Sequence, residues 1–251
     1  MKNVFHSKYK EFEDDIDVYI NDFDNIGDSI KDSRNKLKLF NLSDGTVINV
    51  KSFKVPNLIN KIVYNFFRKS KAQRSFEYAN KLLEFNIGTP APVAYYEFYS
   101  PLFFKKSFYI SEQLECDLTY RELTTNFDYP DYDAILRAFT RFTYNLHEKG
   151  ILFLDHSPGN TLIKKEGDDY NFYLVDLNRM KFEILVFETR VKNFSRLTIH
   201  KSMVEVMSDE YSKCTGENYD KIFSLMWSET EAFQEKFHRK KRLKKKFLFW
   251  K

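Results

Sequence analysis

The chain has 251 residues, of which 43% are apolar, 18% aromatic and 30% charged, and its formal net charge is +4. This composition supports one or two buried cores and excludes a disordered chain, and two cysteines exclude a disulfide framework. No run approaches the roughly 18 apolar residues that span a bilayer, and the N-terminus lacks the apolar stretch of a secretion signal, so we expect a soluble cytoplasmic protein.

The N-terminal part of the chain predicts a small antiparallel sheet. Residues 1–35 are polar and acidic, and the alternation within residues 17–20, Asp-Val-Tyr-Ile, favours an edge strand. Two β-rich runs, 37–42 and 47–53, flank the pair Asp44 and Gly45. A short Asp-Gly connection between two such runs is typical of a β-hairpin.

A helix and two further strands follow this hairpin. Apolar residues recur at spacings of three and four within 57–86, which predicts a helix, and strand-like segments come at 93–98 and 107–111. A second helix is predicted over 134–149, with Gly150 directly after it, where glycine commonly ends a helix.

The second half is mostly helical apart from three short strands, predicted at 151–154, 161–163 and 172–175. From residue 181 onward the pattern is helical. The order favours an α+β, bilobal arrangement. We expect an N-terminal lobe of residues 1–112, built from strands and one main helix, and a mostly helical C-terminal lobe of residues 113–251.

Three polar side chains follow apolar strands in the second half. Asp155 precedes Asn160 by five positions across a Pro-Gly turn, and Asp176 directly follows an apolar strand. Phosphoryl transfer uses these residue types: one carboxylate orients the acceptor hydroxyl, and an amide oxygen with a second carboxylate holds Mg²⁺ on the nucleotide phosphates. The Asp-x4-Asn pair alone is a weak signal, and its placement between apolar strands strengthens it.

The segments Asp-His-Ser-Pro-Gly-Asn at 155–160 and Val-Asp-Leu-Asn-Arg at 175–179 resemble the lipopolysaccharide kinase family, the bacterial Kdo and heptose kinases with their InaA-like relatives. The resemblance covers about residues 35–185 and implies a protein-kinase-like fold, with ATP and Mg²⁺ as cofactors and a sugar hydroxyl of the lipopolysaccharide inner core as acceptor. It implies that Asp155 is the catalytic base or orienting group, and that Asn160 and Asp176 are the metal ligands.

The same resemblance assigns a phosphate-binding lysine in the first half. Val-Ile-Asn-Val-Lys at 47–51 is similar to the third-strand motif of kinases, so Lys51 would hold the α- and β-phosphates and Glu77 would be its partner on the helix. Lys54 competes with Lys51, and Glu84 competes with Glu77. Strand alternation places Lys51 and Ile48 on opposite faces, and the choice of Lys51 depends mainly on the resemblance.

Adenine would lie against the link between the lobes, near Glu112 and Leu114, a placement that follows from the analogy alone. The chain also departs from eukaryotic-like kinases. No arginine precedes Asp155, Leu177 and Asn178 replace Phe-Gly, and no glycine-rich loop precedes the hairpin. A loop with side chains, around 25–34, would then cover the phosphates. These absences favour a glycan or small-molecule acceptor over a protein.

Structural roles compete with these assignments. Asp155 and Asn160 could simply stabilise a tight turn, and Asp176 could be a helix N-cap. We expect His156 to be a solvated loop residue. Two other functions stay open: a small-molecule phosphotransferase of the aminoglycoside or choline kinase type, and a catalytically idle kinase-like scaffold that binds at a membrane surface.

The C-terminal segment 236–251 carries nine Lys or Arg and no acidic residue. The rest of the chain therefore has 31 basic and 36 acidic residues, a formal charge of −5. Basic residues beside Phe247, Phe249 and Trp250 suit an anionic bilayer surface, so the protein could bind peripherally at the inner face of the cytoplasmic membrane. A solvated helix whose last aromatics dock on the body is the alternative, and we do not expect nucleic acid as a partner.

Overall fold

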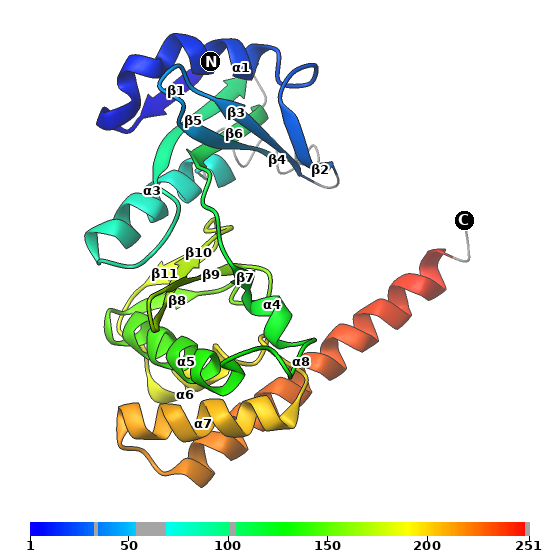
Figure 1. Ribbon diagram of the computed structural model, residues 1–251. Helices are drawn as coiled ribbons and strands as arrows, with labels where there is room; N and C mark the ends of the chain where they lie inside the picture. Colours follow the sequence, from blue (N-terminus) through cyan, green and yellow to red (C-terminus); the bar gives the residue numbers. More distant parts are fainter. Residues whose placement is uncertain (33–34, 54–68, 101–103, 249–251) are drawn as a thin grey trace. The chain divides into compact units, whose positions relative to one another are not determined.

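The computed structural model describes residues 1–32, 35–53, 69–100 and 104–248 (Figure 1). The chain forms two compact units. The N-terminal unit comprises Met1–Glu115 and Val175–Arg179, and the C-terminal unit comprises Cys116–Leu174 and Met180–Lys251. The segment Val175–Arg179 therefore packs with residues that are distant in sequence.

An antiparallel sheet of order β1-β5-β6-β4-β3-β2 forms the N-terminal unit. Its strands are β1 (Lys2–Phe5), β2 (Asp28–Asp32), β3 (Lys36–Asn41), β4 (Val47–Phe53), β5 (Pro92–Tyr99) and β6 (Phe104–Glu112). The predicted hairpin is confirmed, since β3 pairs with β4 from Lys36 opposite Ser52 to Asn41 opposite Val47. Gly45 has a φ of 87° in the turn, a conformation that costs glycine little.

The edge strand predicted at 17–20 is wrong. A 3₁₀ helix, η1 (Ser7–Phe12), leads into the helix α1 (Glu13–Asn21). Ile16 and Ile20 are one helical turn apart and fully buried against the face of the sheet that carries Ile48 and Val50. Ile16, Val18 and Ile20 fit the period of a strand, and Ile16 and Ile20 also fit that of a helix, so the burial of this i, i+4 pair decides for the helix.

The other face of the sheet is covered by α3 (Lys71–Glu84). Ser70 is its N-cap and accepts a hydrogen bond from the Gln73 backbone N–H at 3.0 Å. Ala72 and Phe76 pack with Phe53 of β4 and Tyr95 of β5. The helical prediction is confirmed for these residues, whereas 54–68, including Lys54, lie outside the described residues.

Two small sheets and the main helices form the C-terminal unit. One sheet has the order β10-β9-β7 and the other pairs β11 with β8. The strands are β7 (Leu118–Thr119), β8 (Ile151–Phe153), β9 (Thr161–Glu166), β10 (Asp169–Leu174) and β11 (Met180–Phe182), and the helices are α4 (Tyr120–Leu123), α5 (Tyr132–Glu148), α6 (Phe187–Lys192), α7 (Lys201–Thr215) and α8 (Tyr219–Leu248). The strands predicted at 151–154, 161–163 and 172–175 and the helix predicted at 134–149 are confirmed. The helical prediction from residue 181 is wrong at its start, because Met180–Phe182 form β11 and pair with β8, and α6 begins only at Phe187. The sheet-rich and helix-rich units together give the expected α+β arrangement.

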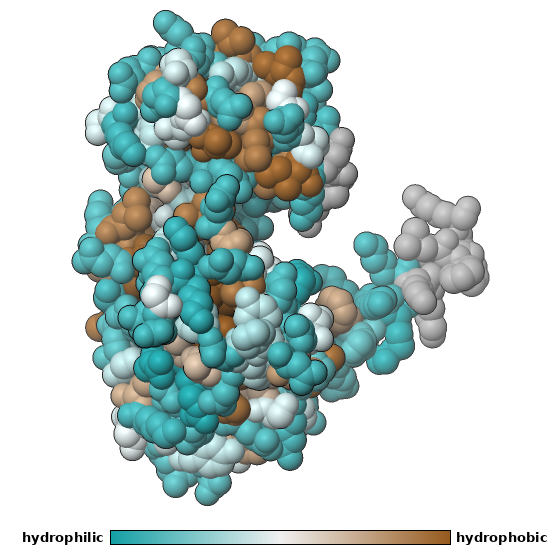
Figure 2. All heavy atoms as spheres, viewed as in Figure 1, coloured by the Kyte–Doolittle hydropathy of each residue, from teal (hydrophilic) through white to brown (hydrophobic). Residues whose placement is uncertain are grey.

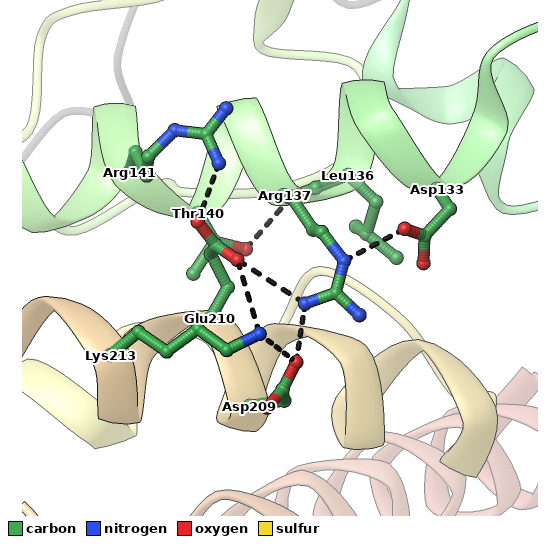
Figure 3. Close-up of polar contacts among 8 residues, drawn as sticks. All are labelled: Asp133, Leu136, Arg137, Thr140, Arg141, Asp209, Glu210 and Lys213. Atoms are coloured by element: carbon green, nitrogen blue, oxygen red, sulfur yellow. Dashed lines mark hydrogen bonds and ion pairs between the residues drawn. The ribbon is translucent and has the colours of Figure 1, made fainter.

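Charged side chains join α5 to α7 (Figure 3). Arg137 on α5 binds Asp133 at 2.7 Å, and it also binds Asp209 and Glu210 of α7. Arg141 binds the other oxygen of Glu210, whose side chain is only 10% exposed. Because an unpaired carboxylate is costly to bury, this network fixes the two helices against each other.

The helix α8 packs on α6 and α7 and then continues beyond them (Figure 1). Side chains 235–244 are all exposed, and the projecting part of the helix is mostly hydrophilic in Figure 2. Within the part of the chain that the structure describes, no helix combines the length and apolar character that crossing a membrane requires.

Candidate active site

Lys51 lies on β4 and Asp176 lies in the segment that returns to the N-terminal unit. The Lys51 ammonium is 2.9 Å from Oδ1 of Asp176. The strand register puts Lys51 opposite Leu37 and Tyr109, on the face away from the α1 core, as the alternation predicted. The side chains of Lys51 and Asp176 are 17% and 35% exposed, respectively, so this ion pair is partly open to solvent.

The backbone of Asp176 has an uncommon conformation, with a φ of 61°. Aspartate adopts this left-handed region more readily than most residues. The Asn178 amide donates to the same Oδ1 of Asp176 at 2.7 Å, and Asn178 is itself buried. No helix begins among residues 176–186, so the alternative that Asp176 is a helix N-cap is wrong.

Glu77 does not have the partner that the sequence predicted. Its carboxylate accepts hydrogen bonds from the Lys69 ammonium at 2.8 and 2.9 Å and from the Gln73 amide at 3.0 Å. Gln73 is one turn earlier on α3, and Lys69 directly precedes the N-cap Ser70, so both reach Glu77 locally. The structure thus pairs Lys51 with Asp176 and leaves Glu77 bonded to its own helix and the residue before it.

The residues predicted for adenine lie at the end of β6. The Glu112 backbone N–H donates to Ala91 at 2.8 Å, and its carboxylate binds the Tyr9 hydroxyl and the Lys8 ammonium. The Leu114 carbonyl accepts a 3.4 Å hydrogen bond from Gln113. The Glu112 carboxylate is therefore already bonded to η1, which leaves the backbone groups near Glu112 and Leu114 as the candidates for hydrogen bonds to adenine.

In the C-terminal unit, Asp155 and Asn160 close a loop after β8. The Asn160 amide donates to the Asp155 carbonyl at 2.8 Å, and its N–H donates to Ser157 at 2.9 Å. The first bond orients the Asn160 side chain and leaves its oxygen as an acceptor. Asn160 thus stabilises the turn, as the structural alternative predicted, while keeping a possible metal ligand.

An arginine that the sequence analysis missed binds Asp155. Arg196 Nη1 lies 2.9 Å from Asp155 Oδ1 and 2.7 Å from the Leu154 carbonyl. The guanidinium also lies 5.5 Å from the ring centre of Phe233 on α8. Kinases with His-Arg-Asp place an arginine next to the base in sequence, and here the contact comes from 41 residues later.

The expectation that His156 is solvated is wrong. The side chain is fully buried between Phe139, Phe153 and Phe194. Neither ring nitrogen has a hydrogen-bond partner in the described residues. Burial lowers the pKa of His156 to about 3, so the ring is neutral. The uncharged side chains of Phe153 and His156 thus form a buried layer beneath the 155–160 loop.

The sequence is similar to one known protein family. A model of the lipopolysaccharide kinase (Kdo/WaaP) family matches residues 51–225, more than half of the chain. The chain belongs to this family.

A solved structure supports the fold, and two kinases resemble the chain more weakly. The structure of WaaP in complex with acyl carrier protein superposes with a TM-score of 0.64 at 16% identity, covering 95% of this chain and 99% of that one. The Rio2 kinase–ADP/Mg²⁺-phosphoaspartate complex from Chaetomium thermophilum gives 0.48 at 13% identity over 88% and 75%, and the MAP kinase LmaMPK10 from Leishmania major gives 0.49 at 14% over 86% and 66%. No curated protein matched the sequence.

The lipopolysaccharide kinase is therefore a phosphotransferase with an alcohol group as acceptor. Its family phosphorylates sugar hydroxyls of the lipopolysaccharide core and uses a nucleotide as phosphate donor. A group of three or more His, Cys, Asp or Glu able to hold a metal is absent among the described residues.

Proposed function

We propose that this lipopolysaccharide kinase transfers the γ-phosphate of ATP, with Mg²⁺, to a Kdo or heptose hydroxyl of the inner core. Asp155 orients the hydroxyl and accepts its proton, while Asn160 and Asp176 are the metal ligands. Lys51 binds the α- and β-phosphates. In this proposal residues 1–112 bind the nucleotide and residues 113–251 carry the catalytic loop.

The ion pair of Lys51 and Asp176 is the observation that carries the proposal. The two residues are distant in sequence, and both have side chains partly open to solvent. A phosphate-binding cation and a metal-binding anion must lie close together, because a bound Mg²⁺ would neutralise charge on the same phosphates that the lysine would hold. The pair has this arrangement inside one unit.

The donor atoms fit Mg²⁺. Asp176 supplies a carboxylate and Asn160 an amide oxygen that its own hydrogen bond leaves available. Magnesium prefers such oxygen ligands and commonly takes only one or two from the protein. When bound, the ion neutralises charge on the phosphates that Lys51 also contacts.

Glu77 and the 112–114 segment have supporting roles in the proposal. Lys51 would exchange Asp176 for Glu77 when Asp176 turns to the metal, and Glu77 would then leave Lys69. The Glu112 carbonyl and the Leu114 backbone would bind adenine, since the Glu112 N–H is bonded to Ala91 and its side chain to Lys8 and Tyr9.

Two substitutions test this assignment. Asp155→Asn and Asp176→Asn should each reduce transfer of ³²P from ATP to purified core glycan by at least about 10³-fold. Asp133→Asn, on the exposed side of α5, is the matched control. Asp155→Asn should retain Mg²⁺-dependent thermal stabilisation by ATP, whereas Asp176→Asn should lose it. Wild-type turnover in either variant contradicts the proposal.

The acceptor is tested on the wild-type enzyme. Transfer to core glycan, with the phosphate located on Kdo or heptose by mass spectrometry, supports a lipopolysaccharide kinase of that specificity. Transfer to aminoglycosides or choline alone would favour the small-molecule alternative. Nucleotide binding with no turnover on any of these acceptors would favour the scaffold.

We also propose that the end of α8 binds the anionic inner face of the cytoplasmic membrane. Residues 235–244 are exposed, and residues 239–242 are four consecutive basic residues. Each cation near anionic headgroups contributes about 1 kcal/mol. The enzyme should co-sediment with vesicles containing anionic lipid, and not with neutral ones. Reversal of residues 239–242 to Glu should abolish this.

An acidic protein could occupy the same helix. WaaP has been solved in complex with acyl carrier protein, so that protein is the competing partner in this test. Capture of acyl carrier protein by the wild-type chain, with no vesicle binding, would contradict the membrane proposal.

A further inference from the structure

Arg121 of α4 contacts the 155–160 loop at Gly159. A Cβ built on Gly159 would lie 2.6 Å from the Arg121 Nη2 atom and 3.5 Å from its Cζ. The φ of Gly159 is outside the left-handed region, so the backbone does not require glycine there. A side chain at position 159 would instead displace the end of the Arg121 side chain, because its first carbon would meet the guanidinium.

The charge of Arg121 has no carboxylate partner among the described residues. Arg137, Arg141, Arg190 and Arg196 of the same unit each bind one. Arg121 is exposed instead. The protein thus holds one permanently charged guanidinium against the loop without neutralising it.

The acids nearest to Arg121 in sequence are bound elsewhere. Glu122 accepts hydrogen bonds from the Thr119 backbone N–H at 2.9 Å and from its hydroxyl at 2.6 Å, which forms a capping box. Asp117 accepts from the Lys165 N–H at 2.7 Å. Both carboxylates therefore accept hydrogen bonds from groups other than the Arg121 guanidinium.

We propose that Arg121 binds an anionic group of the acceptor, a carboxylate or a phosphate, while the acceptor hydroxyl lies at Asp155. This inference depends on the proposed function of the loop. The Asn160 side chain bonds to the Asp155 carbonyl and closes the loop, so Gly159 is one residue from the closing contact. An acceptor at Asp155 therefore passes close to Gly159 and the guanidinium.

The chemistry of arginine suits this ligand. Its planar guanidinium binds carboxylate and phosphate through two parallel hydrogen bonds and stays charged at any physiological pH. A lysine at the same place would keep the charge and lose the paired geometry. Arg121 would therefore contribute to acceptor specificity.

Steady-state kinetics on the full chain test the role of Arg121. Arg121→Ala should raise KM for core glycan by about 10-fold or more with kcat and the KM for ATP unchanged, and Arg121→Lys should fall between. Lys221→Ala, a surface lysine of α8, is the control. A higher KM for ATP, or an unchanged KM for glycan, would overturn the proposal.

Modified acceptors identify the anion. The increase in glycan KM caused by Arg121→Ala should disappear with one of two modified acceptors: core glycan whose carboxylates are reduced to alcohols, or dephosphorylated core glycan. The modification that removes the increase identifies the anionic group that Arg121 binds. If Arg121→Ala loses the same factor on both neutralised glycans as on the native one, the contact is not electrostatic and the proposal fails.

A double-mutant cycle tests the role of Gly159. Gly159→Ala should displace the guanidinium and raise the glycan KM as Arg121→Ala does, and in the Arg121→Ala background it should have no further effect. Additive effects would overturn the role of Gly159. An active Asp155→Asn enzyme would refute the proposed function, whereas an unchanged KM in Arg121→Ala beside an inactive Asp155→Asn refutes this inference alone.

Discussion

The two carboxylates of the candidate site are held in different ways. Asp176 binds Lys51, whose flexible side chain makes one ion pair among the residues that the structure describes and lies 5.4 Å from the Phe53 ring centre. Asp155 binds Arg196, whose guanidinium is also bonded to the Leu154 carbonyl and lies over Phe233. The first cation is free to exchange partners, and the second is fixed by the protein.

This difference matches the chemistry proposed for each residue. A phosphate-binding lysine must release its carboxylate when nucleotide arrives, which a partly solvated ammonium on a four-carbon stem does at small cost. A base must instead keep its oxygen in one position for the acceptor hydroxyl. The arginine with its additional contacts meets that requirement.

The largest expected effect comes from removing the exchangeable cation. Lys51→Met should lower kcat/KM by about 10²–10³-fold, because a charge that stabilises the transferring phosphates is lost. Lys36→Met on the neighbouring strand β3 is the matched control, since Lys36 binds exposed Asp24. The measurement is phosphate transfer under saturating glycan. If Lys51→Met and Lys36→Met behave alike, Lys51 has no role in binding phosphate.

The second effect concerns the rigidity of the C-terminal unit. Glu210→Gln should lower the free energy of unfolding by about 2–3 kcal/mol, because Arg137 and Arg141 lose their buried partner. Asp133→Asn removes an exposed partner of Arg137 and should cost less than about 0.5 kcal/mol. Urea unfolding of both variants measures this. Equal losses would mean that burial of Glu210 is unimportant.

The third effect isolates the fixed arginine. Arg196→Lys should lower kcat about 10-fold with unchanged KM for ATP, because an ammonium on a flexible stem lacks the planar guanidinium that lies over Phe233 and therefore holds Asp155 and the Leu154 carbonyl less firmly. Arg196→Met should lower kcat further, and the partial activity of the lysine variant distinguishes positioning from folding. A loss of thermal stability at full kcat would instead assign Arg196 a structural role.

How much of this could be predicted from the sequence differs between local and distant contacts. The hairpin at Asp44 and Gly45 and the helix α5 have strong local signals, and the structure has both. In the stretch that forms α1, the spacing of Ile16, Val18 and Ile20 fits a strand and that of Ile16 and Ile20 also fits a helix, so the hydrophobic period is ambiguous. Residues 155–160 and 175–179 are recognisable as family motifs because their polar residues lie within a few positions of each other.

The partners of the site residues depend on the fold and have no local signal. Arg196 binds Asp155 from 41 positions away, and Lys51 binds Asp176 from 125 positions away. His156 looks polar in the sequence because it lies between Asp155 and Ser157, while three aromatic side chains bury it. Only the tertiary structure supplies these aromatic neighbours.

The smallest expected effect is a loss of folding stability at acid pH, which comes from two buried histidines, His147 and His156. Burial lowers the pKa of His156 to about 3 and that of His147 to about 4, from an ordinary value of 6.5. The unfolded chain therefore binds more protons than the folded one below pH 6.5, and stability is lost as pH falls toward 4. Each histidine should cost about 1 kcal/mol between pH 6.5 and 5.5.

Substitution separates this effect from other titrations. His156→Phe keeps the ring among its aromatic neighbours, so it should reduce the loss between pH 6.5 and 5.5 by about 1 kcal/mol, measured by urea unfolding. His238→Gln on the exposed part of α8 should leave the pH dependence unchanged. Parallel curves for wild type and His156→Phe would mean that His156 is already hydrated in the native state. Water would then lie beneath the 155–160 loop, and Arg196 alone would hold the Asp155 carboxylate in place.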